Sequence, residues 1–272
     1  MNTTSFQRTR TFVGVALALL AMCVGGCTSM TPGQMGWVKT DSDKPRAGNV
    51  YLLRGWIGIF SYGINDLGDK INKDGVRASV YQDDQWHALA DTIRAKYKGA
   101  RTAEPLVLIG HSFGADDVVR VAQELAPANV TVDLLVTLDP VTPPDVPPNV
   151  KRVVNLYQSN GAWDKVPAFR GVPLKLAEGS HAQLVNADVK KDRTDLLEPG
   201  TDHFNIEKKG KIHQEVLKYV LETCPPRQAW ARANGVNAAT ASSTPAKPTG
   251  PMYAGPRSQQ QAGNAPPAKS TE

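Results

Sequence analysis

The chain is long enough for one domain with flanking segments, and its charge is nearly balanced. Its 272 residues contain 31 lysines and arginines against 26 aspartates and glutamates, which gives a formal net charge of +5. The basic excess lies in the two terminal segments and leaves the middle of the chain nearly neutral. A nucleic-acid-binding surface is therefore not expected.

The first 26 residues have the pattern of a bacterial signal peptide of the lipoprotein type. Arg8 and Arg10 precede an apolar run, residues 12–24, that is too short for an ordinary membrane span. The run leads into Val24-Gly25-Gly26-Cys27, which resembles a lipobox, the motif whose cysteine thiol receives a diacylglyceryl group. We therefore expect residues 1–26 to be removed and Cys27 to carry lipid.

Lipid attachment predicts where the protein works. A lipidated Cys27 would tether the chain to the periplasmic face of the bacterial cell envelope, with residues 27–44 as a linker. Thr28 rather than an aspartate follows the cysteine, which by resemblance to enterobacterial lipoproteins indicates the outer membrane. The alternative is a plain secretory signal that is cleaved near Cys27. In both cases the mature chain works outside the cytoplasm.

The composition changes again at Pro225. Residues 225–272 are mostly Ala, Pro, Gly, Ser, Thr and Gln, with few large apolar side chains. Such a segment buries too little apolar surface to offset the entropy lost on ordering. We expect a disordered tail over residues 225–272 and one folded domain over residues 45–224. Only Cys224 remains for that domain, so an intramolecular disulfide is not expected.

Between these segments the apolar residues alternate between the spacing of strands and the spacing of helices. The expected elements in chain order are strand 50–53, helix 64–71, strand 76–81, helix 86–97, strand 106–109, helix 115–125, strands 134–138 and 153–157, and helix 212–220. Residues 172–189 stay open between one more strand and a hairpin. Strands that alternate with helices predict an α/β fold, with a mostly parallel sheet covered on both faces.

One motif lies at the boundary between an expected strand and an expected helix. Gly110-His111-Ser112-Phe113-Gly114 follows an apolar strand directly and opens an amphipathic helix. A tight turn there leaves no room for side chains at the flanking positions, which accounts for the glycines. The turn exposes the serine hydroxyl above the sheet, at a helix N-terminus that favours developing negative charge. Ser112 is therefore the candidate nucleophile.

With this motif in its setting, the stretch from about Val50 to Val220 resembles the α/β-hydrolase superfamily, in particular its small lipases, esterases and thioesterases. The resemblance implies a nucleophile, an acid and a histidine that follow one another in this order along the chain. It does not specify a substrate.

The base must be a histidine after Ser112, and a carboxylate must orient it. His203 lies in the loop before the last expected helix, where members of the superfamily keep their histidine, and we favour it over His181. For the acid, Asp139 ends an expected strand and so faces the same edge of the sheet as the serine. Asp164, one strand later, remains the alternative.

The oxyanion of the reaction needs two backbone N–H donors. The resemblance assigns one to Phe113, directly after the nucleophile, and the other to Trp56, in the loop after the first strand. Lipases often have His-Gly in that loop, whereas this chain has Arg54-Gly55. Asp116 and Asp117 are expected to stabilise the first turn of their helix. The sequence has no metal-ligand spacing, and neither a metal nor a cofactor is expected.

Together these residues predict an exported serine hydrolase that cleaves small esters or lipids through an acyl-enzyme. A thioesterase or acyltransferase with the same three residues is a second possibility, and a noncatalytic envelope lipoprotein that keeps the fold is a third. Residues 140–149 join two expected strands and contain five prolines, which restrict them to extended conformations. No cap domain is therefore expected over the site.

Overall fold

The computed structural model describes residues 44–55, 61–100, 103–159, 161 and 170–236. The predicted signal peptide, nearly all of the linker and most of the predicted tail lie outside these residues. So do three of the residues singled out from the sequence, namely Cys27, Trp56 and Asp164.

The core of the described chain is a six-stranded sheet in which every neighbouring pair of strands is parallel. The spatial order is β2-β1-β3-β4-β5-β6. The strands are β1 (Asn49–Leu53), β2 (Arg77–Tyr81), β3 (Leu106–His111), β4 (Leu134–Leu138), β5 (Arg152–Tyr157) and β6 (Gln183–Asp188). Five of them lie where the apolar runs predicted, and β6 occupies part of the region that stayed open.

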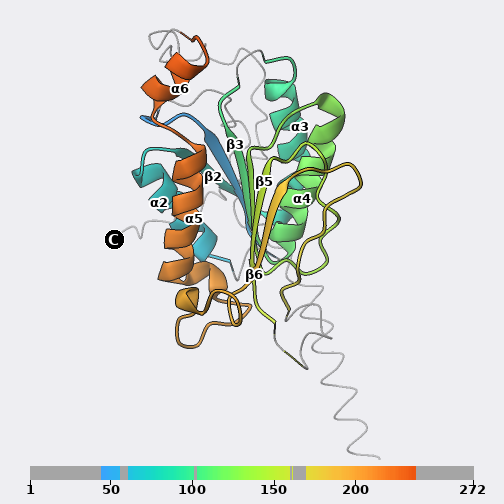
Figure 1. Ribbon diagram of the computed structural model, residues 1–272, viewed down its shortest axis with the longest axis vertical. Coiled ribbons are helices and arrows are strands. Elements are labelled where there is room, and N and C mark those ends of the chain that lie inside the picture. Colours follow the sequence, from blue (N-terminus) through green and yellow to red (C-terminus); the bar gives the residue numbers. More distant parts are fainter. Residues whose placement is uncertain (1–43, 56–60, 101–102, 160, 162–169, 237–272) are drawn as a thin grey trace, which may run out of the picture. The chain divides into compact units, whose positions relative to one another are not determined.

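Helices cover both faces of this sheet (Figure 1). α2 (Gly63–Lys73) and α5 (Gly210–Thr223) lie on one face, and α3 (Trp86–Tyr97) and α4 (Phe113–Leu125) lie on the other. Short 3-10 helices add η3 (Asp83–Gln85), η4 (Ala126–Ala128), η7 (Thr194–Leu196) and η8 (Ile206–Lys208). The predicted α/β fold, with a parallel sheet between two helical layers, is confirmed.

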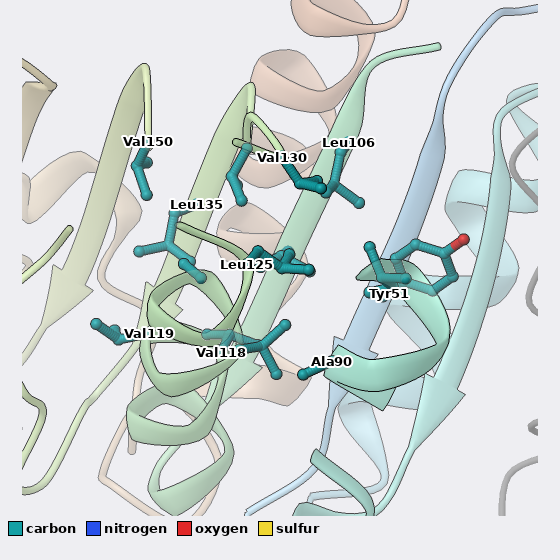
Figure 2. Packing of buried hydrophobic residues seen from close by; sticks show 14 of the residues in the cluster. Tyr51, Ala90, Leu106, Val118, Val119, Leu125, Val130, Leu135 and Val150 are labelled. Carbon is teal, nitrogen blue, oxygen red and sulfur yellow. The ribbon is translucent and has the colours of Figure 1, made fainter. Parts of the chain in front are cut away.

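The core consists of two apolar clusters, one on each side of the sheet. Successive side chains of a strand point to opposite faces, so Tyr51 packs in the cluster of α3 and α4, whereas Leu52 packs in the cluster of α2 and α5. Figure 2 shows Val118 and Leu125 of α4 in one cluster with Leu106 of β3 and Leu135 of β4. Because helices cover both faces, β1, β3 and β4 are buried along their whole length, which is why their sequences are continuous apolar runs.

The parallel arrangement brings all the carboxyl ends of the strands to one edge. The chain enters at β1, adds β2 on one side and then adds β3 to β6 on the other, so the order reverses between β1 and β3. Loops diverge at such a point and leave room for a ligand. There β1 leads to Gly55, β3 to Ser112 and β4 to Asp139.

The described chain does not end where the disordered tail was expected to begin. A further helix, α6 (Arg227–Ala233), follows α5. Trp230 of this helix is buried in a small cluster with Ala47. The Arg227 guanidinium pairs with the buried carboxylate of Glu104 and also donates to backbone carbonyls.

The predicted tail boundary at residue 225 is therefore wrong, and the segment that packs on the domain extends to residue 236. Its apolar content is too low to predict a helix, because one tryptophan and one alanine provide its buried surface. Much of what attaches it is polar, including Arg227 and an antiparallel bridge between Arg46 and Pro226. Hydrophobic periodicity does not report such contacts.

The connection between β4 and β5, residues 139–151, is fully described and contains no helix. Val141 and Val146 of this connection are buried, so it lies against the domain. The absence of a helical insertion at this position agrees with the expectation drawn from its prolines.

Candidate active site

Ser112 occupies a strained turn between β3 and α4. Its backbone angles are φ 57° and ψ −125°, a conformation that residues with side chains rarely adopt. A Cβ atom at Gly110 would overlap the carbonyl of Gly114, and one at Gly114 would overlap the carbonyl of Arg54. Both glycines are thus required by the tight packing around the serine.

His203 lies beside this serine. The Ser112 Oγ is 3.0 Å from the His203 Nε2, within hydrogen-bonding distance. The histidine belongs to the loop that precedes η8 and α5, and its side chain is buried. The ring of Phe204, which is 40% exposed, meets the His203 ring edge-on at 5.4 Å between centroids. The pair Ser112–His203 has the geometry of a nucleophile and its base.

Asp139 lies on the other side of the same histidine. Its Oδ2 is 3.4 Å from the His203 Nδ1, which is longer than a formed N–H···O bond. The carboxylate is fully buried and the backbone of Asp139 has a φ of 47°. Catalytic hydrogen bonds often tighten only when substrate binds.

Gln158 holds the Asp139 carboxylate, and the sequence did not single it out. Its backbone N–H donates to Oδ1 at 2.6 Å and its side-chain amide donates to Oδ2 at 3.0 Å. Gln158 is the first residue after β5. The reasoning that selected Asp139, a polar residue directly after a buried strand, would also have found Gln158. Gly171 packs on the same carboxylate, and a side chain there would collide with it.

A second group of buried polar side chains lies behind the serine. The His111 Nδ1 is 2.8 Å from the Ser61 Oγ, and its Nε2 is 2.9 Å from the backbone carbonyl oxygen of His203. The Gly55 N–H donates to the same Ser61 Oγ at 3.0 Å. Burial lowers the pKa of His111 to about 3, so its ring is neutral at pH 7.

Glu207 completes this group. Its carboxylate is fully buried, and its Oε2 is 3.9 Å from the His111 Nε2. Neither carboxylate oxygen has a hydrogen-bond partner among the described residues. Burial raises the pKa of Glu207 to about 8, which keeps this carboxyl group mostly protonated at neutral pH. No spacing in the sequence indicates Ser61 or Glu207.

The remaining predicted residues fall in different places. Phe113 is the first residue of α4, so its backbone N–H belongs to the helix N-terminus next to the serine. Trp56 is not described, but Gly55 before it lies so close that a Cβ atom there would be 2.8 Å from the Ser112 Cβ. His181 is exposed.

Asp116 and Asp117, which follow the turn at Ser112, have different hydrogen-bond partners. Asp116 lies in the first turn of α4 as expected, but its carboxylate accepts hydrogen bonds from the backbone N–H groups of Val141 and Thr142, in the connection after β4. It therefore ties the helix that follows Ser112 to the loop that begins at Asp139. Asp117 pairs with Arg120 of the same helix.

Within the described ranges, no three His, Cys, Asp or Glu side chains are grouped so that they could hold a metal ion. In the same part of the chain, no helix combines the length and the apolar character that a membrane span requires.

No family model and no curated protein matches the sequence. Among solved structures, the chain is similar to a hydrolase of the alpha/beta superfamily from Xanthomonas campestris pv. campestris (15% identity, TM-score 0.33), over 63% of this chain and 99% of that one. It is also similar to the NocB thioesterase domain of the nocardicin cluster (13%, TM-score 0.37), over 64% and 94%. A third is an α/β serine hydrolase without a lid from Xanthomonas campestris (14%, TM-score 0.35), over 71% and 84%. Likenesses this distant do not bear on activity.

Proposed function

We propose that this chain is a serine hydrolase that cleaves carboxylic esters through an acyl-enzyme intermediate. The observation that carries the proposal is the 3.0 Å approach of the Ser112 Oγ to the His203 Nε2, with the buried Asp139 carboxylate behind the same imidazole. These residues come from three separate loops at one edge of the sheet. Their order, nucleophile then acid then histidine, is the order of the superfamily that the sequence resembles.

In the proposed reaction, His203 takes the proton of the Ser112 hydroxyl as its Oγ attacks the carbonyl carbon of the ester. The new oxyanion is stabilised by backbone N–H groups, for which we propose Phe113 and Trp56. The protonated His203 then donates its proton to the leaving alkoxide, and the acyl group remains on Ser112. Water, activated by the same histidine, attacks the acyl carbon and releases the acid.

Asp139 has a supporting role in this scheme. Its carboxylate accepts the Nδ1–H of His203 and stabilises the positive charge that forms on the ring. Gln158 fixes the carboxylate from the opposite side, so that Oδ2 stays directed at the histidine. Asp139 thus fits the position of the acid.

A noncatalytic scaffold fits these observations less well. The positive φ angles of Ser112 and Asp139 each carry a cost of order 1–3 kcal/mol. A protein that only bound or bridged other components would gain nothing from this strain. A thioester would be cleaved by the same groups, and we propose carboxylic esters because acyl-CoA is confined to the cytoplasm.

We also propose that the protein is exported and held at the envelope by lipid on Cys27. The support is the sequence pattern of residues 1–27. The described chain starts at residue 44, just before the amino end of β1, and the candidate site lies at the carboxyl ends of the strands. A tether would therefore join the domain at the edge of the sheet opposite the site.

Labelling with a fluorophosphonate, followed by digestion and mass spectrometry, tests the proposed chemistry. The reagent reacts with activated serines, so the tagged peptide should contain Ser112. Ser112→Ala should lose the label and lower kcat on p-nitrophenyl acetate by about 10⁶, as loss of the nucleophile does in a serine protease. Ser180→Ala is the matched control and should keep both. Label on another serine, or full activity in Ser112→Ala, would refute the proposal.

A further inference from the structure

The polar groups behind the nucleophile form one continuous chain of hydrogen bonds. It runs from the Gly55 N–H to the Ser61 hydroxyl, on to the His111 ring and finally to the His203 carbonyl. The N–H of Gly55 donates to the Ser61 Oγ at 3.0 Å. The chain thus joins the loop after β1, the strand end that carries the nucleophile and the loop that carries the proposed base.

The chemistry of these groups fixes the direction of each bond. A backbone carbonyl can only accept, so the His111 Nε2 must carry the hydrogen that meets the His203 oxygen at 2.9 Å. In a neutral imidazole the other nitrogen is then an acceptor. The Ser61 hydroxyl must donate to Nδ1 at 2.8 Å, which leaves its oxygen free to accept from Gly55. Each group can therefore serve as the donor or the acceptor that its hydrogen bonds require.

Burial makes these bonds obligatory. Ser61 is 1% exposed and His111 is 2% exposed, so water cannot replace a partner that is lost. Glu207, whose Oε2 is 3.9 Å from the His111 Nε2, is itself buried and does not supply a counter-charge while protonated. The ring is therefore held in a single neutral tautomer.

We infer that Ser61 and His111 are positioning residues that hold the backbone of Gly55 and the proposed base in register with Ser112. Neither side chain contacts the reacting atoms in this scheme, and the inference rests on the proposed function. Gly55 directly precedes Trp56, the proposed second oxyanion donor. The same series of hydrogen bonds from Gly55 to His203, called the relay below, anchors the backbone of His203, whose Nε2 faces the proposed nucleophile.

The two halves of the relay act on the transition state more than on substrate binding. An N–H donor to the oxyanion and a well-directed base are used only once the tetrahedral species forms. Displacements of about 1 Å in such groups can cost a factor of about 100 in rate. Loss of the relay should therefore lower kcat and leave KM nearly unchanged.

The kinetic test compares Ser61→Ala and Ser61→Thr on p-nitrophenyl acetate. Ser61→Ala removes both hydrogen bonds and should lower kcat by roughly 10- to 100-fold. Ser61→Thr keeps the hydroxyl and should recover most of the loss, whereas Ser180→Ala should match the wild type. A wild-type kcat in folded Ser61→Ala, or a Ser61→Thr variant as impaired as Ser61→Ala while equally stable, would overturn the inference.

A second measurement does not depend on activity. In protein labelled with ¹⁵N-histidine, long-range ¹H–¹⁵N correlation spectra distinguish the two neutral tautomers and the charged ring. We expect His111, assigned by its loss in His111→Gln, to be the neutral Nε2–H form at pH 7. Either of the other forms would overturn the relay even if Ser112 proves essential. If instead Ser112→Ala stays active, the proposed function fails, and the spectra still decide whether the hydrogen-bond chain exists.

Discussion

At the scale of single residues, the Asp139 carboxylate is held in place by its surroundings. Its carboxylate is fully buried, and both of its oxygens accept hydrogen bonds from Gln158. A buried carboxylate without such donors would be costly. With them it stays in a fixed orientation behind His203.

Replacement of Asp139 by asparagine should lower kcat by about 10⁴, because an amide in place of the carboxylate allows the wrong histidine tautomer. The measurement is kcat on p-nitrophenyl acetate. Asp145→Asn, an exposed position in the connection that follows, is the matched control and should retain full activity. If Asp164→Asn is the crippled variant and Asp139→Asn is active, the acid lies one strand later than we propose.

Glu207 should make stability depend on pH between about 4.5 and 8. Its pKa is raised from 4.5 to about 8 in the folded protein, so the native state holds a proton that the unfolded chain releases. Stability should therefore fall as the pH rises from about 4.5 to 8, by up to about 1.4 kcal/mol per pH unit, and level off above. Urea unfolding at pH 6 and pH 8.5 measures this change. Glu207→Gln should flatten it, and an equal slope in that variant would assign the effect to other groups.

His111 should make the protein less stable as the pH falls, which is opposite to the effect of Glu207. Its pKa is lowered from 6.5 to about 3 in the folded protein, so acidification favours the unfolded chain, which takes up the proton. The contribution of His111 to stability is complete above pH 6.5 and is lost as the pH falls towards 3. His111 and Glu207 offset each other between pH 4.5 and 6.5, where their combined effect should be flat.

The sequence identified Ser112, Asp139 and His203 because each follows a rule of position: a turn motif, a strand end and a loop before the last helix. The structure brings these three side chains together. Ser61 and Glu207 follow no such rule. The groups that surround Ser61 and Glu207 come from segments that are distant in the chain, and such contacts leave no periodic trace in the sequence.

At the scale of elements, the same contrast appears between the sheet and α6. β1, β3, β4 and β5 were predicted nearly to the residue because both of their faces are buried, which requires continuous apolar runs. β6 was harder to predict because its first four residues alternate between exposed and half-buried positions. α6 could not be predicted, since a buried ion pair and one tryptophan attach it.

The attachment of α6 predicts a difference between two truncations. Residues 237–272 have few large apolar side chains, so their removal should leave the melting temperature nearly unchanged. Removal of residues 225–272 leaves the buried Glu104 without its guanidinium partner, at a cost on the order of 3–5 kcal/mol. That corresponds to a fall of roughly 10 °C in melting temperature.

Arg227→Ala in the full chain separates the ion pair from the rest of the helix. It should reproduce much of the loss in the longer truncation, and differential scanning calorimetry measures both. Equal melting temperatures for the two truncations would mean that α6 contributes nothing to the domain.

At the scale of the whole molecule, the proposed lipid on Cys27 would determine where the protein meets its proposed substrate. Cys27→Ala should move the protein from the membrane fraction to the soluble fraction, because the acyl chains that hold it can no longer be attached. Intact mass of the wild-type protein should exceed that of the mature polypeptide by the mass of the lipid. Cys224→Ala, at the buried end of α5, is the matched control and should stay in the membrane fraction.

The bridge between Arg46 and Pro226 brings the first and last described segments of the chain side by side. A short link from residue 236 to residue 44 could therefore close the domain into a ring, to be reopened at Gly179, an exposed turn with free space around it. Such a circular permutant would keep every strand pairing, yet its gene would read His203 first, then Ser112, then Asp139. The serine–acid–histidine order that helped to find these residues thus depends on where the chain termini lie. The spatial arrangement of the three side chains depends only on the fold.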